Sequence, residues 1–193
     1  IYGSHFPLNT YISKEIVNKV LDICDKNNIY YMVYTNKELI VKSIKHMTMF
    51  FYKQNYNPNA RIDTIIAGRD YINEITGNFT KLMICDEDRA IYNSIVAKLS
   101  KIEGIDVSPV PHISKKKVDI DGEKKVIQYS YADICAEGAN KWNAIYELTT
   151  RLRIKKEEII AIGDNINDMR MIENAGLGVA MGNGSPHVRA LAD

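Results

Sequence analysis

Two aspartates in one short segment carry the clearest chemical signal in this chain of 193 residues. Asp164 follows Gly163 at the end of a short apolar stretch, and Asp168 comes four residues later, in the first turn of a predicted helix. In open α/β sheets, ligands bind beyond the carboxyl ends of the strands. Magnesium takes one or two carboxylates, with water and substrate phosphate completing its shell. The segment therefore predicts a magnesium ion and a phosphate group at this edge of a sheet. The alternative is that both acids only cap the turn and the helix.

A lysine upstream is the second candidate residue. Lys141 follows Asn140, which is a plausible cap for a helix that begins there. The helix macrodipole disfavours a cation at this end, so a lysine in this place has a reason if it faces a phosphate. The alternative is an ordinary solvated surface lysine.

Two other acidic clusters resemble functional sites in their residue pattern. Asp119-Ile-Asp121-Gly122 has the D-x-D-G spelling of an aspartyl nucleophile loop. However, it lies in an alternating stretch, 115–128, which predicts a hairpin that turns at Asp121-Gly122. Asp86-Glu87-Asp88 is interpreted as the acidic start of a helix rather than as a metal site.

The composition is that of an ordinary globular protein, with 46% hydrophobic and 25% charged residues and a formal net charge of +1. No global field favours nucleic acid or an anionic membrane. No apolar run approaches the roughly 18–20 residues that a membrane span needs. Three separated cysteines (Cys24, Cys85, Cys135) predict buried core residues in a reducing cytoplasm, not a disulfide framework or a zinc site.

The elements that must position these residues fall into two regions. Residues 9–135 predict a mixed α+β unit with antiparallel pairing. Its expected helices are 13–27, 44–56, 69–76 and 88–102. The last helix is expected to carry Ile91, Ile95, Leu99 and Ile102 on one face. The expected strands are 29–35, 38–41, 81–85, 105–110, the hairpin arms of 115–128, and a further strand over 126–135.

From residue 136 the pattern changes. Asn140 caps a helix whose apolar face holds Ala144, Ile145, Leu148 and Leu152. A fully apolar strand over 159–162 predicts burial on both faces. A helix over 167–175, a strand over 177–181 and a helix opened by Ser185-Pro186 follow, which is half of a doubly wound sheet.

Three segments resemble a known family in their residues and in their order along the chain. They are 138–144, 162–168 and 176–183, and they are similar to the C-terminal half of Cof-type phosphatases, in subclass IIB of the haloacid dehalogenase superfamily. The resemblance implies the fold class α/β: a partial Rossmann-like core with a parallel sheet, plus an α+β cap domain of the C2B type. It assigns residues 1–8 to the connection between core and cap, 9–135 to the cap, and 136–193 to the C-terminal part of the core.

The resemblance also implies a function. The expected protein is a magnesium-dependent phosphatase that hydrolyses a small phosphate monoester, such as a sugar phosphate, through an aspartyl-phosphate. By resemblance, Lys141 would steady the nucleophile and the phosphoryl charge, Asp164 would bind Mg²⁺, Asp168 would ligate or orient it, and Asn167 would help to hold the phosphoryl group. A non-catalytic protein that binds a phosphorylated ligand is the alternative. The expected partner is a phosphorylated metabolite in the cytoplasm, with no nucleic acid and no membrane, and the oligomeric state stays open.

One part of the family pattern does not occur in the sequence. The family's D-x-D-G-T motif, with its nucleophile and acid/base aspartates, and a second motif with Ser or Thr would both precede residue 1. We therefore expect these residues to belong to a longer protein and to be inactive alone. We also expect the strand over 159–162 to be left as an exposed apolar edge.

Overall fold

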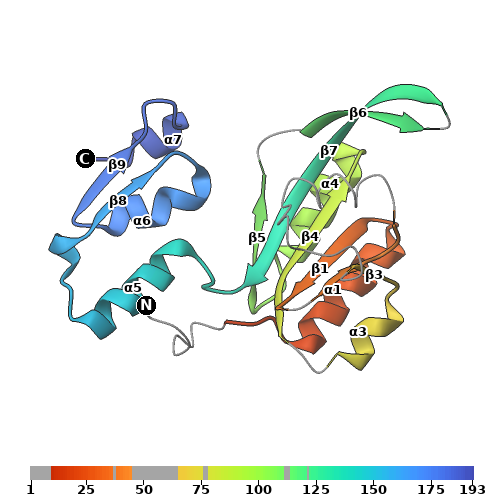
Figure 1. Cartoon of the computed structure of the whole chain (residues 1–193), viewed down its shortest axis with the longest axis horizontal. Coiled ribbons are helices and arrows are strands. Elements are labelled where there is room, and N and C mark those ends of the chain that lie inside the picture. The colour runs from red at the N-terminus through yellow and green to blue at the C-terminus, as the bar shows by residue number, and fades with distance from the viewer. Residues whose placement is uncertain (1–9, 37, 45–64, 76–77, 111–113, 121) are drawn as a thin grey trace. The chain divides into compact units, whose positions relative to one another are not determined.

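The computed structural model describes residues 10–36, 38–44, 65–75, 78–110, 114–120 and 122–193 (Figure 1). In these residues the chain forms two compact units, 10–137 and 138–193. None of the helices within the described ranges has the length and apolar character that crossing a bilayer requires.

The larger unit is built on one seven-stranded sheet with the order β3-β2-β1-β4-β7-β5, to which β6 adds by pairing with β7. All neighbours are antiparallel except β2 and β3, which are parallel. The strands are β1 (Tyr30–Thr35), β2 (Leu39–Val41), β3 (Ile65–Ala67), β4 (Phe79–Asp86), β5 (Ile105–Pro109), β6 (Ser114–Ile120) and β7 (Glu123–Ala136).

The helices of this unit begin where side chains satisfy free main-chain amides. Ser13 caps α1 (Lys14–Lys26) by accepting from the Ile16 amide, and Asp88 caps α4 (Arg89–Leu99). A short α3 (Asp70–Glu74) follows β3.

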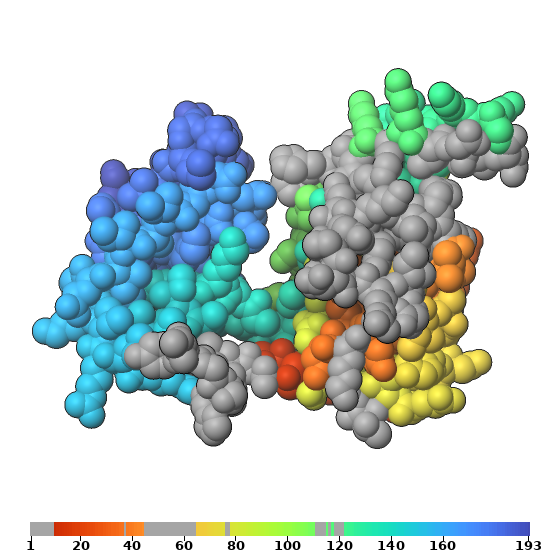
Figure 2. All heavy atoms as spheres, viewed as in Figure 1, coloured from red at the N-terminus to blue at the C-terminus, as the bar shows by residue number. Residues whose placement is uncertain are grey.

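Both faces of the sheet are packed. One face and the helices share a core that includes Val17, Leu21, Val33, Leu82, Ile84, Ile95, Leu99 and Ile134. The other face buries Tyr30, Met32, Met83, Cys85, Ile127 and Tyr129. Beyond this core, the described side chains near the end of the β6–β7 hairpin project into solvent (Figure 2).

Most predicted elements of this unit are present, and three details differ from the prediction. On α4 the predicted face included Ile91, which is 44% exposed, while the neighbouring Tyr92 is buried. The expected further strand over 126–135 is one continuous strand with the hairpin arm, and β3 was not predicted. The expected helix over 44–56 lies outside the described residues, apart from Ile44, and so does the connection over 1–8.

The smaller unit contains a two-stranded parallel sheet of β8 (Ile160–Gly163) and β9 (Leu177–Ala180). Its helical elements are α5 (Lys141–Leu152), the 3₁₀ turns η2 (Lys156–Glu158) and η3 (Ile166–Asp168), α6 (Met169–Asn174) and α7 (Pro186–Arg189). The α6 helix lies so close to β9 that a Cβ on Gly178 would stand 2.2 Å from the Ile172 carbonyl oxygen. Glycine at this position is therefore a packing requirement.

Strand β8 departs from its predicted burial. Ala161 is 4% exposed, but Ile160 and Ile162 are 65% and 61% exposed. The expectation of burial on both faces is wrong for the described residues. The expected open edge is confirmed for them, since β8 has β9 as its one hydrogen-bonded neighbour. The predicted apolar face of α5 is also partly open, since Ala144 and Leu152 are exposed. An apolar strand with one open face and one open edge tends to associate with other chains.

Candidate functional site

The loop after β8 is shaped by the side chain of Asp168. Its Oδ2 atom accepts hydrogen bonds from the Asp164 amide at 3.1 Å and the Asn165 amide at 3.2 Å. The Asp168 amide in turn donates to the Asn165 carbonyl at 2.9 Å, which closes η3. Asp168 is only 4% exposed. The buried carboxylate thus folds the loop back on itself.

Gly163 makes room for this carboxylate. A Cβ at Gly163 would lie 2.4 Å from the Asp168 Cβ atom and 2.9 Å from Oδ2. Contacts under about 3 Å do not occur between such atoms, so any larger residue would displace Asp168. The glycine before Asp164 therefore serves the second aspartate.

Lys141 completes the set of donors to Asp168. Its Nζ atom donates to Asp168 Oδ1 at 2.5 Å, and its side chain stays 52% exposed. The first turn of α5 is fixed by Asn140, whose side chain accepts from the Asn143 amide at 2.9 Å. Burial alone raises the pKa of Asp168, but the hydrogen bond from Lys141 and those from the Asp164 and Asn165 amides outweigh it, so the pKa lies below its usual value.

Asp164 and Asn167 have a different environment. Both residues are exposed. In the described part of the chain, no donor forms a hydrogen bond or ion pair with the Asp164 carboxylate or with the Asn167 side chain. Lys141 therefore donates directly to Asp168, and Asp168 in turn accepts from the main-chain amide of Asp164. Asn167 lies in η3, and its side chain makes no hydrogen bond to Lys141.

The donor set suits a hard cation that brings most of its own ligands. Within the described residues, no group of three or more His, Cys, Asp or Glu side chains could hold a metal. Magnesium needs only one or two protein carboxylates, because water and phosphate oxygens fill its other positions. The more accessible carboxylate for this is that of Asp164, which is exposed, whereas Asp168 is 4% exposed and both of its oxygens already accept hydrogen bonds.

Two residues near Asp164 were not identified as site residues from the sequence. The Ser185 amide donates to the Asp164 carbonyl at 3.1 Å, and Asn165 caps η3. The sequence indicated Ser185 only as the cap of the last helix, which it also is, since Oγ accepts from the Val188 amide. A contact between main-chain atoms of distant residues has no sequence signal.

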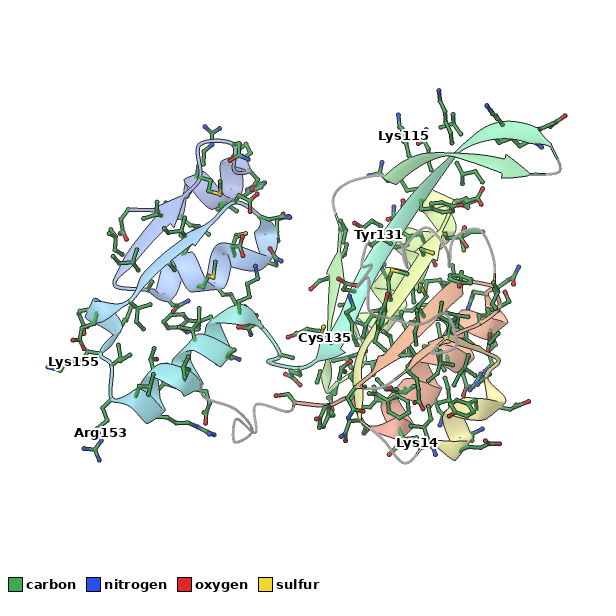
Figure 3. The ribbon with its side chains drawn as sticks, viewed as in Figure 1. Lys14, Lys115, Tyr131, Cys135, Arg153 and Lys155 are labelled. Atoms are coloured by element: carbon green, nitrogen blue, oxygen red, sulfur yellow. The ribbon has the colours of Figure 1, made fainter. Side chains whose placement is uncertain are left out.

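The other sequence candidates have structural roles. Ile120 pairs with Glu123, and Gly122 has φ +83°, as a hairpin turn requires, whereas Asp121 itself lies outside the described residues. Asp88 accepts from the amides of Ala90 and Ile91 at the start of α4. The three cysteines form no disulfide with one another: two are buried, and Cys135, which lies on β7 (Figure 3), is half-buried.

Comparison with known proteins places this site in a family. A family model described as haloacid dehalogenase-like hydrolase matches residues 3–193. This chain belongs to the haloacid dehalogenase-like hydrolase family.

Individual relatives agree with this family assignment. The Bacillus subtilis protein YxeH is 28% identical over 195 residues, which cover 100% of this chain and 67% of YxeH. The 5-amino-6-(5-phospho-D-ribitylamino)uracil phosphatase YcsE of B. subtilis is 44% identical over 61 residues, or 32% of this chain and 24% of YcsE. A haloacid dehalogenase-like hydrolase from Bacteroides thetaiotaomicron shares the fold, with TM-score 0.69 and 22% identity, over 95% of this chain and 61% of its own. The chain thus spans about three fifths of that solved structure.

Proposed function

We propose that this hydrolase chain supplies the metal-binding and phosphate-facing part of a magnesium-dependent phosphatase. Its substrate would be a small phosphate monoester, such as a sugar phosphate, in the cytoplasm. The observation that carries the proposal is the contrast between two aspartates: Asp168 is buried with three donors on it, and Asp164 is exposed with a free carboxylate. The phosphatase activity of the relative YcsE supports the same reaction class.

The proposed roles follow from this contrast. Asp164 would hold the magnesium ion, which neutralises charge on the phosphate oxygens when bound. Asp168 would orient the loop and Lys141 rather than ligate the ion directly. An ammonium group has three donors, and Lys141 uses one of them on Asp168. The other two can reach a phosphoryl oxygen, and the exposed Asn167 amide is a second candidate donor.

We also propose that two regions of the chain have different roles. Residues 9–135 would form the cap and 136–193 the C-terminal part of the catalytic core, which accords with the boundary between the compact units at residues 137 and 138. The nucleophilic aspartate would come from residues outside these 193. The open edge of β8 supports this placement, because among the described residues β8 pairs only with β9 and a further core strand could pair along its other edge.

The experiment compares two proteins. The 193-residue chain alone is expected to hydrolyse no p-nitrophenyl phosphate with Mg²⁺. A protein that carries this chain with an intact D-x-D-G-T segment is expected to hydrolyse phosphorylated metabolites with Mg²⁺, and to lose about 10²-fold or more in kcat/KM in Asp164→Asn. Glu173→Gln, an exposed acid of the same unit, is the matched control.

Two results would overturn the proposal. Turnover by the chain alone that is lost in Asp121→Asn would move the nucleophile to the 119–122 segment. Binding of phosphorylated metabolites without turnover by the longer protein would identify a ligand-binding protein instead of a phosphatase.

A further inference from the structure

The turn after β9 lies against the main chain of Asp164. The Met181 amide donates to the Gly163 carbonyl at 2.9 Å, which continues the pairing of β9 with β8. The Gly184 amide donates back to the Met181 carbonyl at 2.8 Å, so the chain reverses. The Ser185 amide then donates to the Asp164 carbonyl at 3.1 Å. Asp164 is thus held at both ends, because its own amide donates to Asp168.

Gly184 permits this approach. It is buried, and a Cβ on it would stand 2.9 Å from the Met181 carbonyl oxygen, 3.3 Å from the Asp164 carbonyl oxygen and 3.4 Å from the Asp164 Cα. The first contact is shorter than side-chain carbons make and involves main-chain atoms. A methyl group here therefore distorts the turn that brings the Ser185 amide to the Asp164 carbonyl.

A second glycine in the same turn has no such role. Gly182 is exposed, and a Cβ on it would meet nothing within 4 Å. The two glycines share their sequence neighbourhood and their loss of conformational freedom on folding, and they differ in contact with Asp164. They form a matched pair for testing what that contact does.

The turn after β9 is held in place by α7. Ser185 caps α7, and Val188 of that helix is fully buried. The amide that holds the Asp164 carbonyl therefore belongs to a residue fixed by the core of the smaller unit. A restraint of this kind sets the position of the carboxylate before any ligand arrives.

We propose that Gly184 and Ser185 are positioning residues that orient the Asp164 carboxylate for a divalent cation. The inference rests on the proposed function, since it takes Asp164 as the metal ligand. Partners that orient a metal ligand contribute to affinity although they do not touch the ion. One main-chain hydrogen bond corresponds to a change in affinity of about three- to ten-fold.

The test measures cation binding without turnover. Mn²⁺ is added to the chain, and paramagnetic broadening of the amide signals of 163–168 is followed as a function of its concentration. Gly184→Ala is expected to raise the concentration for half-broadening about three- to ten-fold, whereas Gly182→Ala is expected to match the wild type. Equal affinity in both alanine variants of the folded protein would overturn the inference.

A second pair of variants covers the case in which Gly184→Ala fails to fold. Ser185 has φ −60° and ψ 151°, which proline can adopt. Ser185→Pro removes the amide donor and the Oγ cap together, while Ser185→Ala removes only the cap. Weaker Mn²⁺ binding in the proline variant than in the alanine variant supports the inference, and equal binding contradicts it. If the wild type itself shows no broadening at 163–168, the proposed function fails rather than the positioning role.

Discussion

The Lys141 ammonium lies 2.5 Å from Oδ1 of Asp168, across 27 residues of sequence. The contact joins the first residue of α5 to the loop that follows β8. Because the Asp168 side chain is 5% exposed and that of Lys141 is 52% exposed, the buried end of the pair is the acid. The acid is held in place by its donors, and the lysine keeps an exposed face for a ligand.

Replacing Asp168 by asparagine should destabilise the smaller unit. Asparagine retains the shape but loses the charge, so it cannot accept equally from Lys141 and from two main-chain amides. We expect Asp168→Asn to lower the free energy of unfolding by about 1.5–3 kcal/mol, the range for hydrogen bonds to charged groups. Trp142, the single tryptophan of the chain, lies in α5 and reports this transition by fluorescence in urea. Glu173→Gln should leave the transition unchanged.

The loss of stability caused by Asp168→Asn should become smaller as the pH falls. The folded-state pKa of Asp168 lies below its ordinary value of 3.8, because the donors from Lys141 and the loop outweigh the burial that raises it. A lowered pKa gives a contribution to stability that is present above the ordinary value and is lost as the pH falls through the folded-state value. The stability difference between the wild type and Asp168→Asn should therefore be constant from pH 7 down to about 5 and narrow below about 4. A difference that widens on acidification would contradict this account.

The cysteines should differ in their reactivity. The pKa of the Cys24 thiol is raised to about 12, mainly by burial; the nearby Asp25 also raises it, while Lys42 and Arg69 lower it. At pH 8 about one Cys24 thiol in 10⁴ is then ionised, and the thiolate is the reactive form. Iodoacetamide followed by peptide mass spectrometry should leave Cys24 unmodified in the native protein and label half-buried Cys135 sooner. In urea all three should react at similar rates; rapid native labelling of Cys24 would show that its core position is wrong.

The open face of β8 should drive self-association of the chain. Ile162 is 61% exposed on a strand whose other edge is unpaired among the described residues. We expect Ile162→Thr to reduce concentration-dependent light scattering with a stability change within about 0.5 kcal/mol, as for other exposed sites. Ile91→Thr is the control, since Ile91 is also exposed, at 44%, but lies on a helix of the larger unit. Equal reduction in both variants would mean that exposed apolar area in general, and not the open face of β8, causes the association.

The features that could be predicted from the sequence are those set by neighbours in the chain. Asn140 and Ser185 were identified as helix caps because a cap acts within three residues. Asp164 and Asp168 were found for the same reason, since four residues separate them.

The features that were missed depend on tertiary contacts. The choice of Tyr92 over Ile91 for the core depends on the sheet beneath α4. The contact of Ser185 with Asp164 and the glycine requirement at position 184 arise where two strand ends meet. The link between Lys141 and Asp168 was not predicted, because no local pattern joins two residues so far apart; the family resemblance only assigned both residues to one site.

The most direct test of the central claim, that Asp164 is the free metal ligand and Asp168 its support, is a Mn²⁺ titration of the chain followed by amide broadening in NMR spectra. Broadening should centre on residues 163–168, disappear in Asp164→Asn and persist in Glu173→Gln. Broadening that survives Asp164→Asn at wild-type concentrations, or that centres on another acidic segment such as 86–88, would contradict the account.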